Sequence, residues 1–289
     1  MNTQNSSSAF QRFIGRFTGD GGDHNKYRYG QKHGHWIELP DDGDMLSDML
    51  SAEGEYVDGK KHGQWINRLA NGLVEKGPMV DDKKTGHWVA RCAGGGMAES
   101  LLFLLIAKIA GVALPMAKGA YAAGKKHGQW VERFTNGQVE EGPYVDDKRH
   151  GQWIVRDTNG NVEEGPYVDG KVHGHWVLRF ANGDVAEGPL VDRKQHGKWI
   201  FRFANGDVSE GQYVNSIPHG HWVKRYANGA VEEGSVVDGK QHGNWVLRFA
   251  NGEVHEGPVV DGERHGKWIE RKPDGTETEV NWRNGEIVE

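Results

Sequence analysis

The stretch Gly174–His196 reads G-H-W-V-L-R-F-A-N-G-D-V-A-E-G-P-L-V-D-R-K-Q-H, and it decides the fold because the chain repeats it. The next 23 residues, Gly197–His219, follow the same frame. The element His-Gly-x-Trp recurs at six equal spacings of 23 residues over positions 127–265, and the frame continues backwards to His33, so that ten units are counted. A fixed period of this length is typical of a repeat array.

The composition excludes several classes of protein. The chain has 289 residues with 43 glycines, and its aromatic content of 10% is too high for a disordered glycine-rich chain. Its net charge of -6 is small and interspersed, so that no basic stripe suggests nucleic acid. Cys92 is the single cysteine, which excludes an internal disulfide framework. The first ten residues are polar and lack the apolar core of a secretory signal, so we expect a cytoplasmic protein.

Each repeat predicts a β-hairpin. Asn182-Gly183 lies between two runs rich in β-branched and aromatic residues. An Asn-Gly pair in this setting is the strongest short-range signal for a two-residue loop, in which both residues take positive φ. Such a loop places Trp176 opposite Pro189. The predicted apolar face holds these two residues together with Phe180 and Val185.

The same register predicts that the recurrent arginine of each repeat faces a glutamate in its own hairpin. The predicted pairs are Arg133 with Glu140, Arg156 with Glu163, and Arg225 with Glu232. Each pair contributes only about 0.2–1 kcal/mol, so these pairs order the sheet without dominating its stability. A turn at Lys-x-His-Gly then leads into the next tryptophan strand. Ten such units predict an elongated, twisted all-β meander of about twenty strands, on the order of 90–100 Å long.

The run Glu164–Gly174 resembles the MORN repeat, whose consensus is close to Y-E-G-x-W-x-N-G-K-x-H-G-x-G. Glycine in the consensus is replaced here by Trp176, and the tyrosine before E-G varies, a pattern similar to the bacterial MORN variant subfamily. The resemblance covers about residues 27–285. It implies a ribbon of β-hairpins, and it implies a scaffold, a partner-binding surface or a membrane-proximal module. The variant subfamily also includes antitoxins.

One passage breaks the period. The distance from Thr85 to His127 is 42 residues instead of 23, and the excess of 19 residues is the apolar segment 100–118. Ser100 is a candidate N-cap, and the residues after it favour a helix, so we expect one inserted hydrophobic helix. The apolar window 101–117 contains Lys108 at its centre. A spanning helix needs about 20 apolar residues, so crossing a membrane is energetically marginal.

Two interpretations of this segment stay open. It packs against the ribbon or a second copy, or it contacts a membrane. The residues expected to contact lipid in the second case are Leu101, Leu102, Phe103, Leu104, Leu105, Ile106, Lys108, Ile109, Val112 and Leu114. A second candidate is the short basic amphipathic run 10–17. Its apolar residues, which either cap the first hairpin or form an interfacial anchor, are Phe10, Phe13, Ile14 and Phe17.

The recurrent histidines do not predict a metal site. Equivalent positions in a meander lie about 9.5 Å apart, whereas zinc ligands lie about 2.0–2.1 Å from one ion. Recurrence likewise favours core packing for the tryptophans. The chain has no nucleophile elbow, phosphate loop or HExxH motif. We therefore expect no catalytic residue, no metal and no cofactor.

These observations divide the chain into a tail with a capping helix (residues 1–26), repeats (27–99), the hydrophobic segment (100–118) and further repeats with a C-terminal cap (119–289). Two functional hypotheses follow. In the first, a non-enzymatic repeat protein contacts or inserts into membranes through its segment, and a conditional membrane-permeabilising effector is one form of it. In the second, the chain is a soluble scaffold or antitoxin-type module that binds a protein. The partners expected are membrane lipid, a protein or a second copy, and no nucleic acid.

Overall fold

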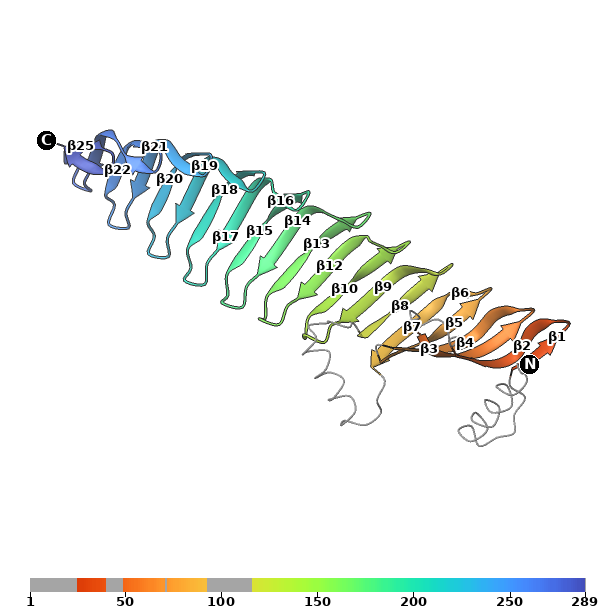
Figure 1. The fold of residues 1–289 in the computed structure, drawn as a ribbon. Helices are drawn as coiled ribbons and strands as arrows, with labels where there is room; N and C mark the ends of the chain where they lie inside the picture. The colour runs from red at the N-terminus through yellow and green to blue at the C-terminus, as the bar shows by residue number, and fades with distance from the viewer. Residues whose placement is uncertain (1–24, 40–48, 71, 93–115, 289) are drawn as a thin grey trace. The chain divides into compact units, whose positions relative to one another are not determined.

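The computed structural model describes residues 25–39, 49–70, 72–92 and 116–288. They are drawn as the coloured ribbon in Figure 1, and they divide into two compact units between Lys125 and Lys126. The strands of the first unit are β1 (Lys26–Arg28), β2 (Gln31–Glu38), β3 (Met49–Val57), β4 (Lys60–Leu69), β5 (Leu73–Val80), β6 (Lys83–Lys84), β7 (Gly86–Cys92) and β8 (Met116–Ala122).

The second unit contains the longer run of repeats. Its strands are β9 (Lys125–Arg133), β10 (Val139–Val145), β11 (Lys148–Arg149), β12 (Gly151–Arg156), β13 (Val162–Val168), β14 (Lys171–Arg179), β15 (Val185–Val191), β16 (Lys194–Gln195), β17 (Gly197–Arg202), β18 (Val208–Val214), β19 (Ile217–Arg225), β20 (Val231–Val237), β21 (Lys240–Arg248), β22 (Val254–Val260), β23 (Glu263–Arg264), β24 (Gly266–Arg271), β25 (Glu277–Arg283) and β26 (Glu286–Val288).

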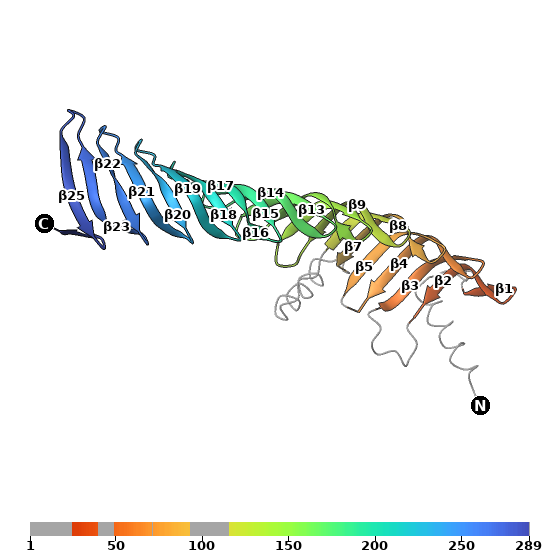
Figure 2. The ribbon, with the colours of Figure 1, turned by 90° about the horizontal axis from the view of Figure 1, so that it is seen from above.

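Each unit is an antiparallel meander in which a strand pairs with the strands before and after it in the sequence. Seen from above in Figure 2, the strands of the second unit rotate steadily from β13 to β25. This is the twist that L-residues impose on a sheet. The prediction of a twisted meander of hairpins is confirmed within each unit.

Two-residue turns connect each hairpin to the next. Asp169 and Gly170 both take positive φ, of 50° and 80°. Asp192 and Arg193 do the same at the next turn, with φ of 48° and 63°. Two successive positive φ values define the mirror-image turn that matches the twist of antiparallel strands.

The Asn-Gly positions form a different loop from the one the sequence predicts. The amide of Phe203 donates to the carbonyl of Asp207 at 2.9 Å, and the amide of Gly206 donates back to the carbonyl of Phe203 at 2.9 Å. The loop therefore has three residues, and only its glycine takes positive φ, of 90°. The asparagine instead accepts the amide of Asp207 through its side chain at 3.0 Å. The prediction of a two-residue loop was wrong.

This extra loop residue moves the register by one position. Trp176 lies opposite Gly188, not Pro189, and Arg179 lies opposite Val185. A shift of one residue exchanges the two faces of a strand, so the predicted apolar face was also wrong in its return strand. The physical reason is that the tryptophan rings need glycines beside them. A Cβ atom on Gly188 would lie 2.5 Å from the ring of Trp199 in the next repeat.

The His-Gly element is a bulge within a strand, not a turn between strands. Gly174 has φ of 70°, and the pairing of β13 with β14 shifts between Glu164 and Tyr167. His173 lies beside this bulge and is exposed.

The predicted fold class was right in being all-β and wrong in including an inserted helix. The described residues form strands and turns without a helix, and none of them forms a helix long and apolar enough to cross a membrane. Residues 116–118, the end of the predicted segment 100–118, belong to β8. They continue the ladder with β7, where Lys118 lies opposite Val89, and so satisfy backbone groups of that strand. Residues 100–115 lie outside the described residues.

Candidate functional site: the tryptophan face of the sheet

One face of each meander carries the tryptophans, and we call it the tryptophan face. The ring of Trp222 lies over Gly211 of the preceding return strand, where a Cβ atom would come within 2.2 Å of the ring. The indole nitrogen of Trp199 donates to the carbonyl of Pro189 at 3.0 Å. Trp199 is 1% exposed and Trp153 is fully buried, which confirms the prediction that the tryptophans form the core.

Three further positions of each repeat decide what covers these rings. They are the residue before the histidine, the residue two after the tryptophan, and the residue two before the buried glycine. All three point to the tryptophan face, because side chains alternate along a strand. In the repeat that contains Trp130, these positions hold Lys126, Glu132 and Glu140.

The repeats over residues 126–167 cover the rings with charges, and we call this part of the tryptophan face the charged stretch. The Lys126 ammonium lies 4.5 Å from the centre of the Trp130 ring and 2.5 Å from the Glu132 carboxylate. The Arg149 guanidinium lies 4.3 Å from the Trp153 ring and pairs with Glu140. Cations over aromatic rings are attracted by the ring quadrupole. Both carboxylates are more than nine-tenths buried, so these ion pairs close the face to solvent.

The next two repeats have no charge at these three positions. They hold Val172, Leu178, Ala186, Gln195, Phe201 and Ser209. Phe201 stacks between Trp199 and Trp222, with ring centres 6.1 Å and 6.4 Å away. Beyond them, Lys224 and Glu232 restore the charges.

This change of composition leaves a groove. A depression of about 490 Å³ lies over β14, β15 and β17, and we call it the apolar groove. The side chains of its wall that the argument uses are Leu178, Phe180, Ala186, Leu190, Phe201 and Phe203. Phe180 and Phe203 are 43% and 39% exposed. Large apolar side chains exposed together around a concavity are typical of binding sites.

The pKa values of two tyrosines are raised for different reasons in the charged stretch and beside the apolar groove. Burial raises the pKa of Tyr144 in the charged stretch, and the nearby Glu132 carboxylate raises it further. Burial alone raises the pKa of Tyr213 beside the apolar groove. Tyr213 therefore lacks the carboxylate contribution that Glu132 makes to the pKa of Tyr144.

The opposite face carries a ladder of arginines and glutamates, but not with the predicted partners. Arg179 bonds Glu164 of the preceding hairpin at 2.8 Å, and Arg225 bonds Glu210 in the same way at 2.8 Å. The predicted partner Glu163 lies opposite Val155 instead. These pairs therefore connect neighbouring repeats, and the prediction of pairs within one hairpin was wrong because the register differs by one residue.

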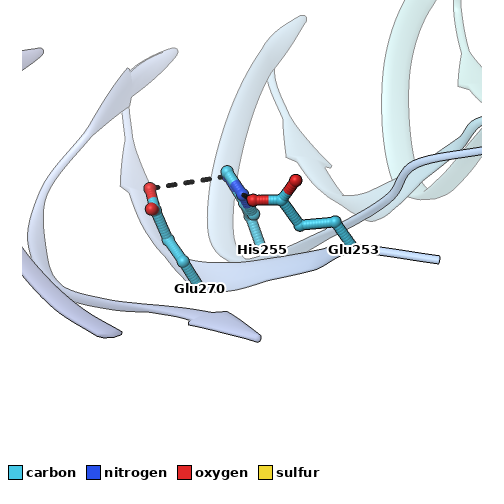
Figure 3. A group of neighbouring side chains, drawn as sticks. All are labelled: Glu253, His255 and Glu270. Carbon is cyan, nitrogen blue, oxygen red and sulfur yellow. Dashed lines mark hydrogen bonds and ion pairs between the residues drawn. The ribbon is translucent and has the colours of Figure 1, made fainter. Parts of the chain in front are cut away.

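A second polar group lies near the C-terminal end of the second unit. His255 of β22 lies opposite Glu270 of β24, and Glu253 directly precedes β22 (Figure 3). The three side chains have ligand atoms within 4.8 Å of one another. His255 is not one of the recurrent His-Gly histidines, and the sequence signal for it is that it replaces the glutamate, alanine or serine found at this position in other repeats.

The site residues predicted from the sequence stay predictions. The ten lipid-contacting residues between Leu101 and Leu114, and the anchor residues between Phe10 and Phe17, lie outside the described residues. Sequence reasoning missed the apolar groove, although an alignment of the repeats shows Phe201 at a position where some other repeats have a charged residue, such as Glu132 or Lys224.

A family model of the MORN repeat matches residues 53–64, 210–231 and 233–254, so the chain contains MORN repeats, as its sequence predicts. None of the curated proteins matches the chain.

Solved structures similar to this chain include the TCP10 domain of Danio rerio CPAP, which is 14% identical with a TM-score of 0.37 and covers 80% of this chain and 95% of that chain. The CPAP G-box domain is 16% identical with a TM-score of 0.39, and covers 60% of this chain and 90% of that chain. The SAS-4 TCP domain of Drosophila melanogaster, in complex with a proline-rich motif of Ana2, is 15% identical with a TM-score of 0.36, and covers 54% of this chain and 85% of that chain. At these scores the likenesses carry no argument about function.

Proposed function

Since the chain contains MORN repeats, we propose that it is a non-enzymatic repeat protein that binds a protein partner, and that the apolar groove receives the partner's bulky apolar side chains. One observation carries the proposal. Ion pairs of Lys126 and Arg149 with buried glutamates close the tryptophan face over residues 126–167. In the next two repeats, the equivalent positions on this face hold uncharged residues. The repeats keep the same frame across this change, so folding alone does not require it.

The energetics favour a side chain of the partner in the groove. Apolar surface removed from water contributes roughly 25 cal/mol per Å², or about 1.5–3 kcal/mol for one fully buried large side chain. Phe180 and Phe203 flank the groove and are pre-ordered by the hairpin loops in which they lie. Aromatic residues held in this way are typical of binding hot spots, because little side-chain entropy is lost on binding.

The rim of the groove indicates the chemistry of the bound segment. Arg193 lines the groove at the turn between β15 and β16, and it is exposed. Among the described residues it makes no ion pair or hydrogen bond through its side chain. Asp184 at the opposite end is already engaged, since its carboxylate accepts the amide of Ala204 at 2.8 Å. We therefore expect a segment with a bulky apolar residue followed or preceded by a carboxylate.

The test is a selection of peptides from a random phage-displayed library on the full chain, followed by affinity measurement with synthetic peptides. The proposal expects enriched peptides that combine bulky apolar and acidic residues. Phe201→Glu should weaken their binding at least tenfold. This variant should still fold, because Glu132 occupies the equivalent position of an intact repeat.

A second test variant is Phe203→Glu, and its matched control is Phe249→Glu. Phe249 is 38% exposed, nearly the same as Phe203, and occupies the same position of its repeat as Phe203, but it does not line the groove. Its substitution should leave peptide affinity unchanged. Equal losses in both variants, or no enriched peptides, would overturn the assignment of the groove as the binding site.

The membrane hypothesis is a separate proposal that rests on the sequence of residues 101–114, which lie outside the described residues. Leu104→Glu should abolish binding to liposomes, and Lys108→Leu should strengthen it, because it removes the one central charge. Unchanged flotation or dye leakage across both variants would rule out this role. A location in the cytoplasm stays a prediction.

A further inference from the structure

Two carboxylates converge on one imidazole at the end of the second unit (Figure 3). The His255 Nε2 atom lies 2.8 Å from Glu253 Oε1, and its Nδ1 atom lies 3.6 Å from Glu270 Oε1. The His255 side chain is 15% exposed, and the carboxylates are 28% and 27% exposed. The group is thus a half-enclosed polar pocket on the tryptophan face.

The carboxylates of this group lack the lysine or arginine partner that buried carboxylates have in the charged stretch. In the charged stretch the residue before the histidine pairs with a carboxylate on the same face, as Arg149 does with Glu140. The equivalent residue here is Arg264, which lies over the rings of Trp268 and Trp282 at 4.2 Å and 5.0 Å. No ion pair joins Arg264 to Glu270 among the described residues. Among the described residues, neither Glu253 nor Glu270 forms an ion pair with a lysine or an arginine.

An unfilled hydrogen-bonding position points in the same direction. The Nδ1 atom of His255 is buried and has no hydrogen-bond partner in the described part of the chain. The Phe249 ring packs edge-on against the imidazole at 4.8 Å and fixes its orientation. The Glu270 carboxylate, 3.6 Å away, is too distant for a hydrogen bond, so a proton donor or a metal ion at Nδ1 would supply the partner that a buried ring nitrogen needs.

We propose that His255, Glu253 and Glu270 form a zinc-binding site. One imidazole and two carboxylates form a ligand set that suits Zn²⁺, whereas Mg²⁺ and Ca²⁺ take oxygen ligands. Zinc–ligand distances of about 2.0–2.2 Å require the three ligand atoms to lie somewhat closer than the 4.8 Å limit within which they lie. Because Glu253 now lies at Nε2 and Glu270 at Nδ1, rotations of the two partly buried glutamate side chains must bring both carboxylates to the Nδ1 side of the ring, and water completes the coordination.

The ion would join two hairpins. Glu253 and His255 belong to the loop and strand before β23, and Glu270 belongs to β24. A ligand that binds only the folded state stabilises it by mass action. Bound Zn²⁺ should therefore protect the last repeats, which lie at the end of the array, from local opening. This site is separate from the apolar groove, so the two proposals stand or fall independently.

The test is a titration of the full chain with Zn²⁺ by calorimetry, with Co²⁺ absorption as a spectroscopic probe of coordination. The proposal expects one site, a visible Co²⁺ band with an imidazole ligand, and slower amide exchange in β22 and β24 when Zn²⁺ is present. His255→Ser should weaken Zn²⁺ binding at least tenfold. Serine occupies this position in a folded repeat at Ser209, so the variant should remain folded.

Glu270→Gln should also weaken binding at least tenfold while it preserves shape. The control is His219→Ser, which removes an exposed histidine of the His-Gly bulge and should leave the affinity unchanged. Equal Zn²⁺ binding in all four proteins would show adventitious binding to surface histidines and overturn the proposal. Absence of binding in the unsubstituted chain would overturn it as well, and would leave His255 as a purely internal partner of the two glutamates.

Discussion

The charged stretch and the apolar groove are built on the same backbone and differ in what lies over the tryptophans. In the charged stretch, Lys126 and Glu132 cover the rings and the face is closed. In the groove, Gln195 and Phe201 occupy the same two positions of the repeat, and the face is open. The difference teaches that the frame of glycines and tryptophans determines folding, whereas a few variable positions on one face determine binding.

The largest effect should come from the element that the two regions share. Trp153→Ala and Trp199→Ala should each cost about 3–5 kcal/mol, because each empties a fully buried site beside a glycine. The comparison requires similar costs in both regions, since the frame is common. Hydrogen exchange should show opening that is local to each substituted repeat. A cost confined to the charged stretch would mean that charges, not tryptophans, stabilise the array.

The repeat period could be predicted from the sequence, but the face of the sheet to which each side chain of the return strand points could not. The 23-residue period and the alternation of residues predict the meander correctly. The Asn182-Gly183 pair suggested a two-residue loop, but the alternative three-residue loop uses the same two residues, and local propensity does not separate the two. The choice is made by a contact between repeats, in which Trp199 lies over Gly188. Distant contacts of this kind are invisible to a reading of one hairpin.

The groove and the His255 group were missed for a related reason. Alignment of the repeats draws attention to the residues that all repeats share. The two proposed sites instead depend on residues that differ from those at the same position in other repeats. Phe201 and His255 each break the pattern at a position that faces the tryptophans. Their meaning depends on which face the position occupies, and the one-residue error in register concealed it.

The next effect should come from replacing the charged residues over the tryptophan rings with the uncharged residues of the following repeats. Glu132→Leu should destabilise the chain by about 1–3 kcal/mol, because it leaves Lys126 half-buried without its carboxylate. The double variant Lys126→Val/Glu132→Leu introduces the residues found at Val172 and Leu178, and it should recover much of that lost stability. It should also raise the fluorescence of a hydrophobic dye bound to the folded chain, whereas Phe201→Glu should lower it. A double variant no more stable than Glu132→Leu would contradict this account of the cover.

A smaller effect is the response to acid. Burial raises the pKa of Glu38 in the first unit, but hydrogen bonds from Lys32, Lys61 and Tyr56 outweigh it and lower the pKa to about 2. A carboxyl group whose pKa is lowered on folding stabilises the folded state above its ordinary value of 4.5. That contribution is lost as the pH falls from about 4.5 to about 2.

Amide exchange should therefore accelerate in β2 over this pH range. Strands β14 and β17 should change less, since the tryptophan face there has no carboxylate at the equivalent position. Glu187 lies on the opposite face, where a hydrogen bond from the exposed Arg202 lowers its pKa, and this surface pair adds only a small loss there. Glu38→Gln should remove most of the acid dependence in β2. Equal acid responses of β2 and β14 in the unsubstituted chain would count against the distinction between a charged and an uncharged cover.

The smallest effect tests the register on which the comparison depends. Arg156 pairs with Glu141 of the preceding hairpin, whereas a two-residue loop would have paired it with Glu163. A double-mutant cycle on Arg156 and Glu141 should give a coupling of about 0.2–1 kcal/mol, because the pair is solvent-exposed. The cycle on Arg156 and Glu163 should give none, since the two side chains lie on opposite faces of the sheet. The first coupling should shrink in high salt. If Glu163 proved to be the coupled residue, the tryptophan face would change its members in every return strand, and the groove between Leu178 and Phe203 would no longer exist.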